Sequence, residues 1–318
     1  MSEATLSAPD ASTTAGRFGP NSGVVTELVA GSRYPVHFLQ VETRDGLYAP
    51  IALRLPVGEG PFPLVLFATG NGGGGLGLLR ELTHNRSWTQ ERFLDAGYAV
   101  AWTRYRAEVD YAYDRFGVLV EDIRQGRQLL NRGPLEYEDL ISIAEHAKTL
   151  PFIDGERIGY MGMSHGGEMA LKIASEYRGF RAMIASEPAS HEFVRLRPDE
   201  TAHVDPVSGL LNVERMLMRD PAKVRARITE EVARARVAPI ATPILVQGRD
   251  TDELQGIFRV SYDLLAEADK EARWQSYDHD EHGFVYVGRN DAGVYEPDPV
   301  QTEAVRDSIA FFDEYLKR

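Results

Sequence analysis

The chain has 318 residues, with 35 Lys and Arg against 48 Asp and Glu, and its formal net charge is −13. The acidic residues are spread along the chain, which argues against nucleic acid or an anionic membrane surface as a partner. Cysteine is absent, so disulfides, thiolate metal sites and a cysteine nucleophile are excluded. No apolar run resembles a signal peptide or a membrane span, and we expect a cytoplasmic protein.

Composition also suggests the domain organisation. Residues 1–22 are rich in Ser, Thr, Ala and Gly, which predicts a flexible N-terminal arm. Residues 23–318 are expected to form one domain, because a chain of this length can bury a single large core. The sequence does not indicate the oligomeric state, so a monomer and a homo-oligomer are both compatible with it.

From Val36 onward, short β-branched or aromatic runs alternate with longer helical patterns. This rhythm predicts the α/β class, with a mostly parallel central sheet and helices on both of its faces. Residues 37–43 and 49–56 alternate in polarity around a turn and should form an antiparallel entry hairpin. Further strands are expected at 63–69, 98–105, 157–163, 180–186, 242–247 and 272–277, and helices at 87–96, 118–131, 135–150, 167–177, 257–268 and 300–316.

The rhythm breaks between Glu187 and Ala241, where short charged helical pieces such as 222–236 are separated by Pro188, Pro198, Pro206 and Pro221. We expect a small helical cap here, at about 189–240, which overhangs the strand edge and selects the substrate. Apolar residues at helical spacing could line an acyl pocket or simply form the core of the cap; they are Leu211, Val213, Met216 and Met218.

The strongest single feature is the segment Gly162-Met163-Ser164-His165-Gly166-Gly167, between an apolar strand and a helical pattern. A nucleophilic serine at the end of a central strand must protrude from a tight turn, and small residues on either side permit the crowded backbone. The alternative is a plain turn whose serine caps the helix. The sequence context favours Ser164 as a nucleophile.

A serine hydroxyl needs a base, and that base needs an orienting acid. The strand predicted at 242–247 is followed by Asp250 and Asp252, and the strand predicted at 272–277 by His279 and His282. Because the carboxyl ends of parallel strands meet at one edge, both groups should reach Ser164 there.

We choose His282 as the base, because Gly283-Phe284 allows a sharp return of the chain and an apolar wall beside the ring. His279 is expected to be solvated. Asp252 is preferred over Asp250 because it lies further out on the loop, while Asp250 remains a rival.

Acyl transfer also needs donors for an oxyanion. The backbone N–H of His165 is one expected donor, and Asn71, in the glycine-rich stretch Gly70–Gly75, is the other. The His165 side chain is expected to pack beside the turn without transferring protons.

Four segments together resemble the dienelactone hydrolase and prolyl oligopeptidase-type branch of the α/β-hydrolases. They are Gly162–Gly167, Phe152–Gly159, Gly248-x-x-x-Asp252 and His282-Gly283-Phe284. The resemblance covers roughly Val36 to the C-terminus, leaving out the cap. It implies an α/β-hydrolase fold and a serine hydrolase that needs no cofactor and no metal.

This chain departs from its relatives at several points. It lacks the cysteine nucleophile of many dienelactone hydrolases, so their lactone substrate is not implied, and only about 35 residues precede the first predicted strand. Thr69-Gly70 stands where relatives often have His-Gly. Relatives commonly carry the acid three residues after the glycine, where Thr251 stands here; this keeps Asp250 as a rival.

Some of the same residues would also suit other functional classes. Gly70-x-Gly72-x-x-Gly75 after a strand, with Arg104 and Arg106 ending the next strand, would suit an NADP-dependent oxidoreductase. Against it, the fingerprint normally follows the first strand of the fold and opens directly into a helix. Here two predicted strands precede the strand that ends in it, and Leu76 to Arg86 intervene. A non-catalytic receptor or scaffold, and a metal site at His279, Asp280 and His282, are further alternatives. A solvated, ion-paired surface is the default for Arg104 and Arg106.

The sequence therefore predicts a serine hydrolase that cleaves a small-molecule carboxylic ester, or less readily an amide, through an acyl-serine intermediate. The expected catalytic residues are Ser164, Asp252 and His282. An acylaminoacyl or dipeptidyl-type peptidase, or an acyltransferase, could use the same residues.

Overall fold

The computed structural model describes residues 16–18, 23–70, 75–104, 133–197 and 219–318. In these residues nine strands form one sheet in the order β1-β2-β3-β5-β4-β6-β7-β8-β9. The strands are β1 (Val25–Glu27), β2 (Val36–Glu42), β3 (Tyr48–Arg54), β4 (Phe62–Ala68), β5 (Ala99–Thr103), β6 (Ile153–Met163), β7 (Ala182–Ser186), β8 (Ile244–Arg249) and β9 (Ala272–Tyr277).

The sheet is antiparallel at one side and parallel over the rest. β1, β2, β3 and β5 pair antiparallel, whereas β5, β4, β6, β7, β8 and β9 run parallel to one another. The predicted entry hairpin is β2 and β3, with Val41 opposite Ala49. The α/β class and the mostly parallel sheet are confirmed.

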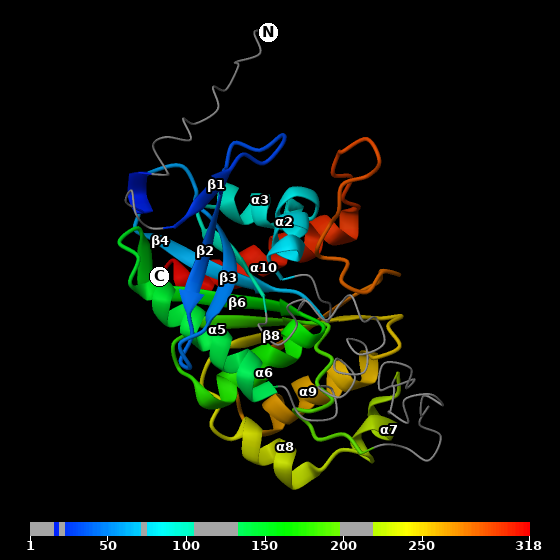
Figure 1. Ribbon diagram of the computed structural model, residues 1–318. Helices are drawn as coiled ribbons and strands as arrows, with labels where there is room; N and C mark the ends of the chain where they lie inside the picture. Colours follow the sequence, from blue (N-terminus) through cyan, green and yellow to red (C-terminus); the bar gives the residue numbers. More distant parts are fainter. Residues whose placement is uncertain (1–15, 19–22, 71–74, 105–132, 198–218) are drawn as a thin grey trace, which may run out of the picture.

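Helices cover both faces of the sheet (Figure 1). One layer holds α5 (Gly133–Lys148), α6 (His165–Glu176) and α9 (Gln255–Glu267), and the other holds α2 (Gly75–Asn85), α3 (Trp88–Asp95) and α10 (Pro299–Leu316). Each layer packs its own apolar cluster against the sheet. All residues of β5, β7 and β8 are buried, as expected for strands covered on both faces.

One strand and one α-helix were not predicted from the sequence. β1 extends the sheet by pairing with β2, although it has only three residues and is partly exposed, so it carries little periodic signal. α2 begins at Gly75, the last glycine of the run. The expectation that Leu76 to Arg86 separate the glycine fingerprint from a helix was therefore wrong. Three strands, and not two, precede β4, the strand that ends at the fingerprint.

The helical piece predicted at 222–236 is split into α7 (Pro221–Arg225) and α8 (Glu230–Val237). Between them the Arg227 carbonyl accepts from Arg197 N at 2.8 Å, and Thr229 N donates to Arg195 O at 3.2 Å. These backbone groups bind the 194–197 segment, so they cannot continue one helix.

The described part of the predicted cap packs with the main core. Val224 of α7 and Val237 of α8 are buried in the same apolar cluster as α6 and α9. The predicted pocket residues Leu211, Val213, Met216 and Met218 lie outside the described residues, as do Asn71, Arg106 and the helix expected at 118–131.

Within the predicted N-terminal arm, Gly16–Phe18 forms a short 3-10 turn. The Phe18 ring lies 5.0 Å from the His37 ring and 5.1 Å from the Phe152 ring, centroid to centroid. In the described ranges, no helix has the length and apolarity that crossing a membrane requires.

Candidate active site

Ser164 occupies a sharp turn between β6, which ends at Met163, and α6, which begins at His165. Its backbone has φ 56° and ψ −115°, a left-handed conformation that costs free energy for any residue with a Cβ. The turn depends on glycine: a Cβ on Gly162 would lie 2.0 Å from the Gly166 carbonyl oxygen. Only hydrogen fits there, so the chain can turn this tightly.

Backbone hydrogen bonds hold the strained serine in place. Ser164 N donates to Ser186 O at 2.9 Å, and Ser164 O accepts from Glu168 N at 3.0 Å and from Ala189 N at 3.1 Å. Gly70, after β4, lies beside the side chain, since a Cβ built on it would be 3.3 Å from Ser164 Oγ. The hydroxyl therefore lies at the carboxyl edge of β4, β6 and β7.

His282 and Asp252 form a hydrogen-bonded pair at this edge. Nδ1 of His282, in the loop after β9, lies 2.9 Å from Oδ2 of Asp252, in the loop after β8. The Asp252 side chain is buried, whereas that of His282 is 38% exposed. Asp252 Oδ1 also accepts from Leu254 N at 2.7 Å. Since Nδ1 faces the carboxylate, Nε2 is the ring nitrogen available to a reacting group.

Side-chain packing brings the His282 loop next to the serine turn. A Cβ atom built on Gly283 would lie 3.0 Å from Met163 Cε, and a Cβ atom built on Gly70 would lie 3.8 Å from the same atom. Met163 precedes Ser164 and Gly283 follows His282. The neighbours of the expected nucleophile and base are therefore in contact.

Two charged residues that sequence reasoning did not single out complete this cluster. Glu187, directly after β7, has Oε1 3.4 Å from His282 Nδ1. Arg249, the last residue of β8, donates from Nε to Glu187 Oε1 at 2.6 Å and from Nη2 to Asp252 Oδ2 at 2.5 Å. Their signal was present in the sequence, because charged residues at the carboxyl ends of buried strands face the edge where sites form.

The surrounding charges and hydrogen bonds shift the pKa values of both His282 and Asp252. Burial by itself lowers the pKa of His282, but hydrogen bonds to Asp252 and Glu187 and their negative charges outweigh it and raise that pKa to about 9. Burial tends to raise the pKa of Asp252, yet hydrogen bonds from His282 and Leu254 and the nearby positive charges lower it to about 2. Both shifts favour the charged forms.

The rival residues of the two loops have other partners. Asp250 is exposed and its Oδ1 accepts from the Ser276 hydroxyl. Thr251, at the position where relatives commonly carry the acid, donates to His279 O at 3.0 Å. The expectation that His279 is solvated was wrong: its side chain is 11% exposed, and Nε2 lies 2.9 Å from Asp298 Oδ2.

The apolar wall expected from Phe284 has a different source. Phe284 stacks on His279, with centroids 5.0 Å apart, whereas Phe258 of α9 stacks on His282 at 6.5 Å. Gly283 has φ +80°, so glycine is needed there for the return of the chain, as predicted.

Beneath the turn, His165 is buried with its Nε2 2.6 Å from Glu136 Oε2 of α5. Its backbone N–H belongs to the first turn of α6, where amide groups lack partners within the helix. Asn71, the other expected oxyanion donor, lies outside the described residues. Arg104 is not on a solvated surface as expected; it is fully buried, and Nη1 donates to Thr69 Oγ1 at 3.2 Å.

Donor atoms of Glu187, Asp252 and His282 lie close enough together to suit a metal ion. The guanidinium of Arg249, however, donates to both carboxylates. The protein thereby supplies the positive charge that a cation would bring.

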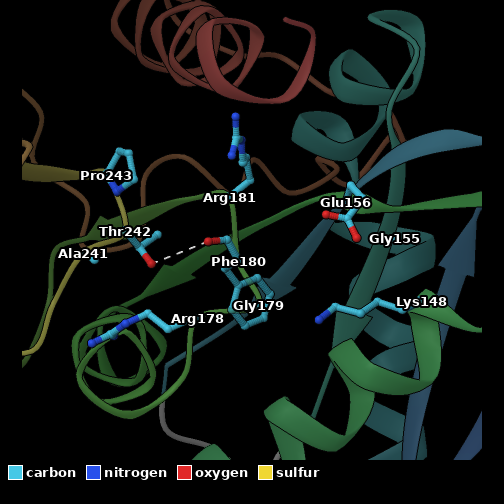
Figure 2. A pocket seen from close by; sticks show the side chains of 10 residues that line it. All are labelled: Lys148, Gly155, Glu156, Arg178, Gly179, Phe180, Arg181, Ala241, Thr242 and Pro243. Atoms are coloured by element: carbon cyan, nitrogen blue, oxygen red, sulfur yellow. Dashed lines mark hydrogen bonds between the residues drawn. The ribbon is translucent and has the colours of Figure 1, made fainter.

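A separate cavity of about 310 Å³ lies at the amino ends of β7 and β8, opposite the strand ends that carry Ser164 and Asp252. Its lining includes Arg181 and Pro243, which directly precede β7 and β8, and the side chain of Lys148 (Figure 2). Ser164 follows the carboxyl end of β6, so this cavity is remote from the cluster around His282.

A model of the prolyl oligopeptidase family matches residues 83–318, which includes Ser164, Asp252 and His282. The chain belongs to this family. It is thus a serine hydrolase of the α/β-hydrolase type, and the resemblance inferred from the sequence is confirmed. Membership of the prolyl oligopeptidase family favours the hydrolase over the dinucleotide-binding oxidoreductase.

Solved structures agree on the fold. The chain is similar to an acylaminoacyl peptidase of Pyrococcus horikoshii, with a TM-score of 0.62 and 18% identity over 90% of this chain and 42% of that chain. It is also similar to an esterase of Pyrobaculum calidifontis, with a TM-score of 0.55 and 17% identity over 91% of this chain and 87% of that chain. A Klebsiella pneumoniae protein assigned as a dienelactone hydrolase gives a TM-score of 0.56 and 15% identity over 92% of this chain and 99% of that chain.

The coverage of these relatives differs. The chain spans 36% to 42% of the length of the dipeptidyl and acylaminoacyl peptidases that it matches. No curated protein matches the chain. At these identities the solved structures establish the α/β-hydrolase fold, and membership of the prolyl oligopeptidase family establishes the hydrolase class.

Proposed function

We propose that this protein hydrolyses a small-molecule carboxylic ester through an acyl-serine intermediate, with Ser164 as nucleophile, His282 as general base and Asp252 as orienting acid. The observation that carries the proposal is the 2.9 Å hydrogen bond between His282 Nδ1 and Asp252, next to a serine in a strained strand-to-helix turn. These are the parts that acyl transfer by a serine requires.

The proposed reaction has two half-steps. Ser164 Oγ attacks the ester carbonyl carbon while its proton passes to His282 Nε2, and the tetrahedral intermediate then breaks the bond to the leaving alcohol, which takes that proton. Water attacks the acyl-serine in the same way and releases the carboxylic acid. The first backbone N–H groups of α6, including that of His165, and the dipole of α6 together stabilise the oxyanion.

Electrostatics support an ester over an amide as the substrate. An amine leaves only after its nitrogen has been protonated, so amide cleavage needs a strong general acid. A pKa of about 9 makes the His282 imidazolium a weak acid, while neutral His282 is a correspondingly strong base. Attack on an ester, whose leaving group is better, gains more from such a base.

Amide cleavage is the second candidate, because the prolyl oligopeptidase family includes peptidases and the chain is similar to an acylaminoacyl peptidase. Transfer of the acyl group to an alcohol instead of water would use the same residues. A panel of nitrophenyl esters, acylaminoacyl anilides and dipeptidyl anilides, with and without an added alcohol, separates these activities.

The test of the proposal is the Ser164→Ala variant beside the wild type. We expect wild-type protein to react with a fluorophosphonate probe and to hydrolyse short-chain nitrophenyl esters, and the variant to do neither while keeping the wild-type melting temperature. Ester turnover by the folded variant would contradict the proposal.

A further inference from the structure

Glu187 is buried and conformationally constrained at the edge of the sheet that carries the serine. Its side chain has 0% exposure, and its backbone has φ 47°, a value that is uncommon for a residue with a Cβ. Its N–H donates to Gln247 O of β8 at 2.7 Å. A strained, buried carboxylate persists only where the surroundings hold it, and such strain is common at functional sites.

The Glu187 carboxylate links the loops that carry the proposed acid and base. Oε1 accepts from Arg249 at 2.6 Å and lies 3.4 Å from His282 Nδ1. Oε2 accepts from the backbone N–H of Gly283 at 2.7 Å. Glu187 therefore contacts the imidazole itself and the residue that follows it.

The charges in this cluster balance only when His282 is protonated. Glu187 and Asp252 carry two negative charges and Arg249 carries one positive charge, so neutral His282 leaves one net negative charge among these buried groups. An imidazolium brings the sum to zero. General-base catalysis produces this imidazolium when Ser164 gives up its proton.

We propose that Glu187 is a second carboxylate of the catalytic site, a positioning residue that shares with Asp252 the task of orienting His282 and stabilising its imidazolium. The proposal rests on the serine hydrolase mechanism above. Asp252 and Glu187 approach the same ring nitrogen from the loops after β8 and β7, so the ring is held from two sides.

Among the described residues, Arg249 and Tyr286 are further ionisable groups that interact with this cluster. Arg249 contacts both carboxylates. Burial, together with the charges of Tyr160 and Glu187, raises the pKa of Tyr286 far above its usual range, so Tyr286 stays neutral. From α9, the apolar ring of Phe258 stacks on the His282 ring. The two carboxylates are thus the groups whose removal should change the titration of His282.

The decisive experiment compares the pH dependence of kcat/KM for the wild type, Glu187→Gln and Glu253→Gln. Glutamine keeps the size and shape of Glu187 and removes its charge, but its amide accepts only one of the two hydrogen bonds that the carboxylate accepts from Arg249 and Gly283. Glu253 lies in the loop after β8 with an exposed side chain, so Glu253→Gln is the control for loss of a negative charge nearby. Nitrophenyl ester turnover gives the rates, and melting temperatures report folding.

We expect the acidic limb of the profile to move down by about one to two pH units in Glu187→Gln, as for loss of an opposite charge beside a titrating group. Glu253→Gln should keep the wild-type limb. The ratio of Glu187→Gln to wild-type kcat/KM should therefore increase as the pH falls toward 7. A ratio that is constant across pH would mean that Glu187 only supports the fold, and would overturn the proposal.

A second measurement serves if Glu187→Gln does not fold. NMR titration of ¹⁵N-histidine-labelled Asp252→Asn, with the His282 signal assigned from its loss in His282→Gln, gives the His282 pKa when Glu187 is its remaining carboxylate. We expect this pKa to stay above 7. A value at or below the ordinary 6.5 would show that Glu187 does not act on His282.

The outcomes keep the two proposals distinguishable. If the wild type neither hydrolyses esters nor reacts with fluorophosphonate, the serine hydrolase mechanism fails, yet the NMR titration still reports whether Glu187 and His282 are coupled. If the wild type reacts as expected but the acidic limb is the same in wild type and Glu187→Gln, the role of Glu187 alone is refuted.

Discussion

Asp250 and Asp252 lie in the same loop but bind different partners, and replacing each by asparagine separates their roles. Both substitutions remove one negative charge from positions two residues apart. Asp252 Oδ2 lies 2.9 Å from His282 Nδ1, whereas Asp250 is exposed and bound to the Ser276 hydroxyl. Only Asp252→Asn should remove the proposed partner of the catalytic base.

The expected size of the effect follows from this geometry. A hydrogen bond to a charged group contributes about 1.5–3 kcal/mol. The Coulomb attraction between carboxylate and imidazolium adds to this, but water screens much of it because the His282 side chain is 38% exposed, and we take about 1.5–2 kcal/mol for it. The total of about 3–5 kcal/mol corresponds to a loss of about 10²- to 10⁴-fold in kcat, at about 1.4 kcal/mol per tenfold change.

The assay is steady-state hydrolysis of a short-chain nitrophenyl ester, with the melting temperature of each variant measured in parallel. Asp250→Asn should stay within about threefold of the wild type, as expected for an exposed carboxylate. Comparable losses in the two variants, or a larger loss in Asp250→Asn, would refute the assignment of Asp252 as the acid.

Four further outcomes are expected. The wild-type kcat/KM should increase about tenfold per pH unit up to a plateau above about pH 9, because the folded protein raises the pKa of His282 to about 9 and only the neutral ring accepts a proton; a limb near pH 6.5 would contradict this. Gly162→Ala should abolish turnover and lower stability by several kcal/mol, since its Cβ would lie 2.0 Å from Gly166 O and the overlap is with backbone, and a folded, active variant would disprove the tight turn. Gly77→Ala, in α2 with nothing within 4 Å of the new Cβ, should instead stabilise the protein by about 0.5–1 kcal/mol at unchanged activity, as chemical denaturation would measure. Dialysis against EDTA should leave activity unchanged, because Arg249 already donates to both carboxylates; loss on dialysis and recovery with zinc would identify Glu187, Asp252 and His282 as metal ligands instead.

Much of the fold could be predicted because its central strands are covered on both faces. Continuous apolar runs mark β4 and β7, and the glycines around Ser164 mark the turn, since both properties reside in short segments. β1 was missed because a short, partly exposed edge strand is specified by its pairing with β2, which its own residues do not encode. The split between α7 and α8 likewise depends on backbone groups that bind the distant 194–197 segment.

For the candidate site too, local sequence features could be predicted, whereas contacts between distant loops could not. The sequence by itself determined the α/β class, the serine turn and the order of nucleophile, acid and histidine, because periodicity and small residues act locally. Only the tertiary structure decided that Asp252 and not Asp250 meets His282, that Phe258 and not Phe284 covers its ring, and that Glu187 joins the cluster. Such contacts join loops far apart in the chain, and they are decided by how the strands align at the sheet edge.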